Sequence, residues 1–272
     1  DLQGRSGINI TGHRYNNYPA ITYLKDGKET INGFANFFVH DRNIPRFGFD
    51  DTTTVFQDRP DYIQKSLQVR QDKSADPRIW VDMLQPYVDS VDLGTGEKYP
   101  IIKGRMEGYP SRNQKGWNNR KYNLIDKVFV SNCGINFYVF RLADIYLYYA
   151  ECLIHAGQTD EALEYINKVH RRAYDQPVDV PSIYDYTSLT DRTKTIDPTD
   201  HLANDVLKYE RWAELTNEGG WWFEVRRWDI GEEEAAYYKR VMGGNLEWYD
   251  NNYAFPIPTS EINSNSLIIQ NP

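Results

Sequence analysis

Hydrophobic and polar positions alternate with a helical period mainly in the second half of the chain. The run from Leu142 to Ala156 is apolar on nearly every face, which predicts a helix buried between neighbours. Gly157 is placed to end this helix, and Thr159 is placed to cap the next one. The second helix is amphipathic, because apolar residues recur at three- and four-residue spacing at Ala162, Ile166, Val169 and Ala173.

Residues 140–173 therefore form a predicted antiparallel helix pair. Its length of about 34 residues is the tetratricopeptide period, with Tyr149 and Ala150 before the Gly157 turn and Ala162 after it. The sequence shows no second copy. A single repeat cannot bury its own faces, so partner helices are expected from elsewhere in the fold.

Further helices are predicted beyond the pair. After a loop over residues 175–200, a third helix is expected from Thr199 to Glu218, with Gly219–Gly220 as its end. A short helix is expected from Glu232 to Arg240, and the tail that follows reads as extended and rich in turns. Three carboxylates of the third helix fall four residues apart and share one face: Glu210, Glu214 and Glu218.

The first 135 residues are loop-rich, because Gly, Asn, Asp and Pro interrupt every regular pattern. Short strands are expected at Phe34 to Val39 and at Lys127 to Ser131, and a short helix from Pro60 to Arg70. The sequence thus predicts a mainly α fold with a few short strands and large irregular regions.

Charge and composition exclude some classes of partner. The net charge of −8 and the pI of about 5.2 argue against a nucleic-acid partner and against an anionic membrane surface. The chain has 21 Tyr and 7 Trp. Such richness is typical of carbohydrate-binding proteins, since a sugar's C–H face packs on a flat ring, although ordinary core packing is an equal alternative for any single ring.

No catalytic or metal-binding motif is present. The histidines and cysteines do not form a zinc pattern, and the sequence lacks a nucleophile elbow and a phosphate loop, so no cofactor or metal is expected. Asp50–Asp51 is the carboxylate doublet that most resembles a glycosidase pair. Adjacent residues in an extended chain point apart, so surface solvation is the favoured interpretation.

The best candidate ligand site is the loop over residues 104–123. It combines flat rings with polar groups suited to vicinal hydroxyls, as a sugar site requires: Tyr109, Trp117 and Tyr122 with Asn118, Asn119 and Arg120. The alternative is that Trp117 anchors the loop on the core. A second candidate is the segment from His13 to Tyr23, which contains Tyr15 and Tyr18.

The stretch GGWWFEVRRWD, residues 219–229, is expected to be structural. We expect Trp222, Phe223 and Trp228 to be largely buried, and the segment to bind nothing. The guanidinium groups of Arg226 and Arg227 would either pair with the three glutamates of the preceding helix or stack on Trp rings.

Four separated segments resemble the SusD/RagB family of surface glycan-binding lipoproteins of Bacteroidetes outer membranes. They are Glu210, Arg211, Glu214 and Glu218 followed by WWFEVRRW; RLADIYLYYAECL with ALEYINKVHRRA; ADPRIW; and YAFPIPTSEI with NSNSLIIQNP. The resemblance is strong over 136–272, fair over 60–135 and weak before that. The chain departs from the family where Gly220 and Trp221 stand in place of an Arg.

The resemblance implies a single SusD-like domain over 1–272, with 1–135 on the ligand side and 136–272 as the helical region. Family chains are roughly twice as long, and their N-terminal half carries a lipobox cysteine and most of the tetratricopeptide helices. The chain is accordingly expected to be the C-terminal portion of such a protein or an unusually short relative.

The resemblance also implies a function. The chain would be a non-enzymatic, surface-exposed component of the cell outer membrane that binds an oligosaccharide or polysaccharide and lies over a SusC-like TonB-dependent transporter. Its contact with the membrane would be only an N-terminal lipid anchor that this chain does not contain. The alternatives are a RagB-type binder of peptides or another nutrient and a tetratricopeptide-type interaction scaffold; a glycoside hydrolase is least favoured.

Overall fold

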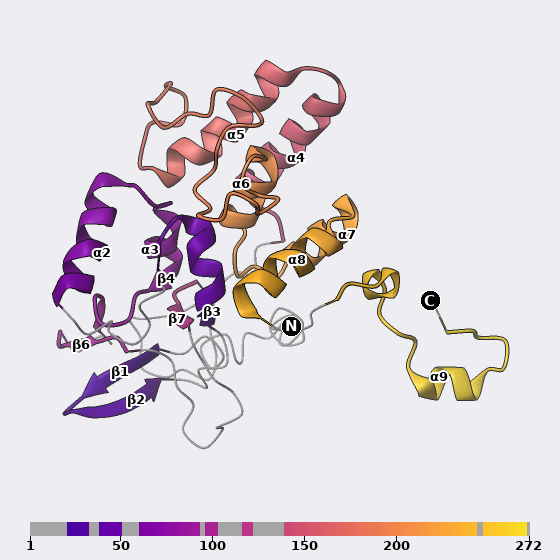
Figure 1. Ribbon diagram of the computed structural model, residues 1–272, viewed down its shortest axis with the longest axis horizontal. Coiled ribbons are helices and arrows are strands. Elements are labelled where there is room, and N and C mark those ends of the chain that lie inside the picture. The colour runs from indigo at the N-terminus through magenta and orange to yellow at the C-terminus, as the bar shows by residue number, and fades with distance from the viewer. Residues whose placement is uncertain are drawn as a thin grey trace. The chain divides into compact units, whose positions relative to one another are not determined.

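The protein divides into two compact units, residues 1–219 and residues 220–272. The computed structural model describes residues 21–32, 38–50, 60–92, 96–102, 116–121, 139–243 and 247–270, and Figure 1 draws them as ribbons. The boundary falls at the glycine pair Gly219–Gly220. The expected mainly α architecture with a few short strands is confirmed.

The first unit contains small antiparallel sheets. Strands β1 (Ile21–Lys25) and β2 (Lys28–Asn32) form a hairpin. Its two-residue turn, Asp26–Gly27, has positive φ at both positions, 52° and 70°. This is the geometry of the hairpin turns whose twist matches the strands, and Asp-Gly is one of the pairs that adopts it readily.

A second sheet has the order β3-β7-β4, made from Phe38–His40, Gly116–Asn119 and Met83–Leu84. A third pairs β5 (Ser90–Asp92) with β6 (Lys98–Pro100). The strand expected at Phe34 to Val39 is confirmed at its C-terminal end, while 34–37 and the expected strand at 127–131 lie outside the described residues.

Helices and aromatic rings cover the β3-β7-β4 sheet. The 3₁₀ helix η1 (Asp41–Phe47), α2 (Pro60–Asp72) and α3 (Arg78–Asp82) supply this part of the unit, and α2 confirms the helix expected from Pro60 to Arg70. The rings of Phe49, Trp80 and Trp117 meet with centroids 5.5 to 6.2 Å apart. Edge contacts of this kind add to the free energy gained by burying the rings.

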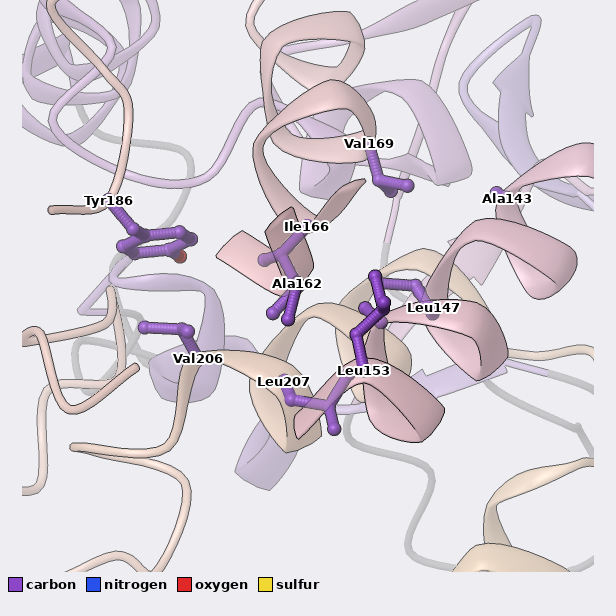
Figure 2. Close-up of a cluster of buried hydrophobic side chains, with 10 residues drawn as sticks. Ala143, Leu147, Leu153, Ala162, Ile166, Val169, Tyr186, Val206 and Leu207 are labelled. Atoms are coloured by element: carbon purple, nitrogen blue, oxygen red, sulfur yellow. The ribbon is translucent and has the colours of Figure 1, made fainter. Parts of the chain in front are cut away.

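The predicted helix pair is confirmed. Helices α4 (Leu142–His155) and α5 (Thr159–Ala173) lie antiparallel, and α6 (Val206–Glu214) packs against both. Figure 2 shows apolar side chains of all three helices meeting in one cluster, joined by Tyr186 from the loop after α5. Gly157 has φ 75°, as expected for the residue that ends α4.

The prediction that α4 is buried on nearly every face is wrong. Leu147 and Ala150 are fully buried, but Leu142, Ile145 and Tyr149 are 64%, 51% and 44% exposed. The reason is that α5 and α6 pack on one face of α4, and no other described element contributes substantially to its burial.

The starts of two helices also differ from expectation. Thr159 lies in the first turn of α5, after Gln158, and its side chain is not the cap. Helix α6 begins at Val206, where Asp205 accepts a hydrogen bond from the backbone N–H of Lys208. The chain from residue 199 to 205 is a loop, because the carboxylate of Asp200 is taken by the guanidinium of Arg46 at 2.8 and 3.2 Å.

The second unit consists of helices α7 (Trp221–Trp228) and α8 (Gly231–Met242), the 3₁₀ helix η2 (Asp250–Tyr253) and α9 (Thr259–Ser264). Helix α8 confirms the short helix expected at 232–240, and α9 corrects the expectation of an entirely extended tail. No described helix in either unit has the length and apolar character needed to cross a bilayer.

Candidate functional site

The candidate loop at residues 104–123 is partly described, and its tryptophan belongs to the core. Trp117 lies in strand β7, is 0% exposed and contacts the rings of Phe49 and Trp80. A ring without exposed surface cannot stack on a ligand, so the expectation of a Trp117 stacking platform is wrong. The alternative, that Trp117 anchors the loop on the core, fits its burial.

The two asparagines beside Trp117 are also buried, with 1% and 0% of their surface exposed. The amide of Asn118 donates to the carbonyl of Ile102, and the amide oxygen of Asn119 accepts from the backbone N–H of Lys121. The expected role of both amides toward sugar hydroxyls is therefore corrected to a structural one. Arg120 is exposed, and the remaining expected ligand residues lie outside the described residues: Tyr15, Tyr18, Tyr109 and Tyr122.

The glutamates of α6 sit at the centre of a buried ion network, as their expected structural role requires. Glu210 is 0% exposed and accepts hydrogen bonds from Arg78 at 2.8 Å and from the hydroxyl of Tyr186 at 3.1 Å. The ring nitrogen Nδ1 of His170 lies 2.7 Å from the same carboxylate. Burial alone would raise the pKa of Glu210, but Arg78 and His170 lower it to about 2.

The network continues to Glu214 at the end of α6 and to Glu218, which lies four residues beyond that helix and not on it as expected. Arg141 binds Glu214 at 2.8 Å and Glu218 at 2.7 Å, and Lys121 binds Glu218 at 3.0 Å. The guanidinium of Arg211, which is also buried, lies 3.9 Å from the ring centroid of Tyr148. Segments separated by more than 90 residues in the chain are thus held together through paired charges.

Arg226 and Arg227 stack on tryptophan rings, which is the second of the two roles that the sequence predicted for them. Their guanidinium groups lie over the rings of Trp222 and Trp228, at 5.9 and 4.7 Å from the ring centroids. Arg227 also pairs with Glu224 one turn earlier at 2.6 Å. The partners of the α6 glutamates are instead arginines and lysine from the first unit.

The aromatic residues of α7 are less buried than expected. Phe223 is 63% exposed, while Trp222 and Trp228 are only half-buried. The cause is the helical geometry of the segment, which points three consecutive aromatic residues in three directions and buries only Glu224 and Val225. The expectation that all three rings are core is therefore wrong.

An aromatic pocket of about 320 Å³ lies within the second unit, and we call it the tryptophan pocket. It is formed by α7, α8 and the segment 247–252, and its volume falls in the range of small-molecule sites. Its lining is mainly aromatic and apolar, with polar groups among them: Trp221, Trp222, Val225, Glu234, Ala235, Tyr238, Glu247, Trp248 and Asn252.

Polar contacts fix the rings of the tryptophan pocket. The indole N–H of Trp221 donates to Glu234 at 3.1 Å. The indole of Trp248 lies so close to Gly231 that a Cβ there would come within 2.0 Å of it. The indole Nε1 of Trp248 is buried and has no hydrogen-bond acceptor among the described residues.

The side chains that line the tryptophan pocket suit the binding of a ligand. Flat rings, two carboxylates and an amide suit a ligand with both apolar and hydroxyl surfaces. Within the described ranges, no cluster of three or more His, Cys, Asp or Glu side chains is placed to hold a metal ion.

Sequence reasoning missed this pocket, although a signal was present. The segment around Trp248 reads EWYDNNY, with aromatic rings beside asparagines, which is the same combination that marked the 104–123 loop. The pocket forms because the turn at Asp229, with φ 55°, folds α8 back against α7. The sequence pattern predicted α8 but not α7, and it did not indicate that residues 221–228 and α8 meet.

Comparison with known proteins identifies the family. No curated protein sequence matches the chain significantly. A SusD-like protein from Bacteroides fragilis has a similar fold, with a TM-score of 0.50 and 20% identity; the match covers 72% of this chain and 38% of that protein. The model of the SusD family matches residues 2–272. The chain therefore belongs to the SusD family.

Proposed function

We propose that the chain is the glycan-binding component of a TonB-dependent outer-membrane uptake system. It captures oligosaccharide or polysaccharide at the cell surface for a SusC-like transporter and does not hydrolyse it. Membership of the SusD family supports this assignment. The match covers 38% of the SusD-like protein, so the activity and partners of the whole protein are part of this proposal.

The tryptophan pocket is the observation that carries the proposal. The half-buried ring of Trp222 lines the pocket and offers apolar surface to a sugar's C–H groups. Glu247 and Asn252 supply acceptors and a donor for neighbouring hydroxyls. In addition, Arg120, Tyr109, Tyr122, Tyr15 and Tyr18 remain proposed contacts for longer glycans.

The experiment is a polysaccharide panel in affinity gels, followed by calorimetric titration of the glycan that binds. Trp222→Ala is expected to weaken binding about tenfold or more, as for a lost aromatic anchor. Tyr149→Ala is the matched control, because this ring is 44% exposed on α4 and outside the pocket, so binding should not change. Circular dichroism should show the same fold for both variants.

Three outcomes would overturn the proposal. Release of reducing ends at enzyme-like turnover would make the chain a glycosidase, for which Glu234 and Glu247 would be the first carboxylates to test. Equal loss of binding in Trp222→Ala and Tyr149→Ala would remove the tryptophan pocket as the site. Binding of peptides with no glycan bound would assign the RagB-type alternative.

A further inference from the structure

A second hollow lies in the first unit, between the C-terminal end of α5 and the loop after it. It has a volume of about 300 Å³ and is lined largely by polar and aromatic side chains: His170, Tyr174, Ile183, Tyr184, Asp185, Tyr186, Asp191, Arg192 and Lys194. We call it the tyrosine hollow. Its volume is at the small end of the range for ligand sites, which suits a single small molecule.

Stacked aromatic rings form the floor of the tyrosine hollow. The ring of Tyr174 lies 4.5 Å from that of His170 and 4.6 Å from that of Tyr184, centroid to centroid. The ring of Tyr186 lies 4.4 Å from the other side of the His170 stack. Asn167 holds the loop in place, because its amide bonds both the N–H and the carbonyl of Tyr186. The floor is therefore preorganised.

The floor carries an unsatisfied polar group. Tyr174 is 0% exposed, and its hydroxyl has no hydrogen-bond partner among the described residues. A buried hydroxyl without a partner costs free energy that a hydrogen bond would return. Tyr174 lines the hollow, so a ligand with an acceptor oxygen is placed to provide that bond.

The hollow also has an excess of positive charge. Lys73, Arg192 and Lys194 surround it, and each bonds only to backbone carbonyl oxygens within the described part of the chain. The ammonium of Lys194 lies 5.7 Å from the ring centroid of Tyr174. Burial lowers the pKa of Lys194, and Asp76 and Asp72 oppose this from beyond ion-pair distance.

The two carboxylates that line the hollow do not balance these cations. Asp185 is held by the guanidinium of Arg171 at 2.6 Å. Asp191 accepts hydrogen bonds from the backbone N–H and hydroxyl groups of Thr187 and Ser188. Neutral donors do not cancel the charge of Asp191, so three cations without a carboxylate partner stand against one carboxylate without a cation partner. In a chain with a net charge of −8, this local excess of positive charge indicates a site for an anion.

We propose that the tyrosine hollow binds a small hydroxylated carboxylate of the uronic-acid type. The carboxylate lies against Lys194, the sugar ring packs on Tyr184, and the hydroxyl of Tyr174 donates to a ligand oxygen. The sugar identity rests on the proposed function of the chain, whereas the preference for an acid rests on the cations alone. The chain thereby prefers acidic over neutral glycans.

The test is titration of the full chain with D-glucuronate and with D-glucose, followed by calorimetry or ligand-observed NMR. Glucuronate should bind at least tenfold more tightly than glucose. Lys194→Met should abolish this preference, because a hydrogen bond to a charged group contributes about tenfold or more to affinity. Tyr174→Phe should weaken glucuronate binding severalfold and leave the fold unchanged, since the lost hydroxyl has no partner in the protein.

Lys168→Met, on α5, is the matched lysine control, because Lys168 pairs with Asp179 outside the hollow and glucuronate binding should be retained. Glucuronate binding that Lys194→Met leaves unchanged overturns the proposal. Equal affinity for inorganic phosphate also overturns it, because the site would then be a general anion site. Trp222→Ala separates the two proposals: if it leaves polysaccharide binding intact, the tryptophan pocket fails while glucuronate binding at the hollow still stands.

Discussion

The two units hold their charged and aromatic side chains in opposite ways. In the first unit, arginine and carboxylate pairs such as Arg78 and Glu210 are buried, and the ring of Trp117 is buried with them. In the second unit, the arginines of α7 lie at the surface, and Trp222 and Phe223 keep exposed ring surface. The difference suggests that the first unit uses its charges for cohesion, whereas the second leaves its rings available to a ligand.

The largest expected effect tests this contrast with one arginine from each unit. Arg78→Ala should lower the free energy of unfolding by about 3–5 kcal/mol, because it leaves buried carboxylates of Asp76 and Glu210 without their partner. Arg227→Ala should cost less, since the Arg227 side chain is 40% exposed and its pair with Glu224 is partly solvated, whereas Arg78 is 5% exposed. Urea denaturation of both variants measures the difference.

Similar costs for the two variants would contradict the contrast. A large cost for Arg227→Ala would mean that α7 depends on its ion pair as strongly as α6 does on its network. A small cost for Arg78→Ala would mean that water or neighbouring donors can replace the guanidinium at Glu210.

A smaller effect is expected from pH at the edge of the buried network. Asp82 is 6% exposed, and burial raises its pKa to about 6 although Lys121 lies 3.2 Å away and opposes the shift. A folded pKa above the unfolded one contributes stability that is fully present below about pH 3.8 and lost as the pH rises through about 6. The full loss is up to about 3 kcal/mol.

Asp82→Asn removes this titrating carboxyl group and should flatten the dependence of the unfolding free energy on pH. The difference in unfolding free energy between the variant and the wild type should therefore grow in favour of the variant from pH 4 to pH 7. Lys121 keeps other acceptors in the variant, since its ammonium also bonds Glu218 and two backbone carbonyls. A constant difference across this pH range would show that Asp82 titrates normally in the folded protein.

The fold of the helical region could be predicted further than that of the sheets. Helical periodicity and Gly157 were sufficient for α4 and α5, because both signals are local. The start of α6 could not be predicted from local signals, because Asp200 contacts Arg46, a residue 154 positions away. The Asp26–Gly27 turn is a local signal that identifies a hairpin, but the analysis of the sequence did not use it.

The candidate site was harder to predict, because burial depends on distant segments. Trp117 and Trp222 look alike in the sequence, because each follows a glycine within two residues. Trp117 is buried because Phe49 and Trp80 arrive from other parts of the first unit. Trp222 remains half-exposed, and it becomes part of a pocket only because Trp248 lies beside it, 26 residues later in the chain.

The smallest expected effect concerns α4, where the sequence predicted burial on every face. Ile145 is 51% exposed, whereas Leu147, two residues later, is 0% exposed on the face that meets α5 and α6. Ile145→Ala should change the free energy of unfolding by no more than about 0.5 kcal/mol, because little apolar surface is lost and Ala favours a helix more than Ile does. Leu147→Ala should cost about 2–5 kcal/mol, since it opens a cavity in the core.

Chemical denaturation of these two variants shows whether one face of α4 is covered or both are. Equal costs would mean that Ile145 is buried in the folded chain, and the helix would then be the two-sided core element that its apolar sequence predicts. Unequal costs would mean that an apolar stripe from Leu142 to Tyr149 faces solvent in this chain. A single tetratricopeptide-like pair has that property on physical grounds, because one repeat cannot bury both of its faces.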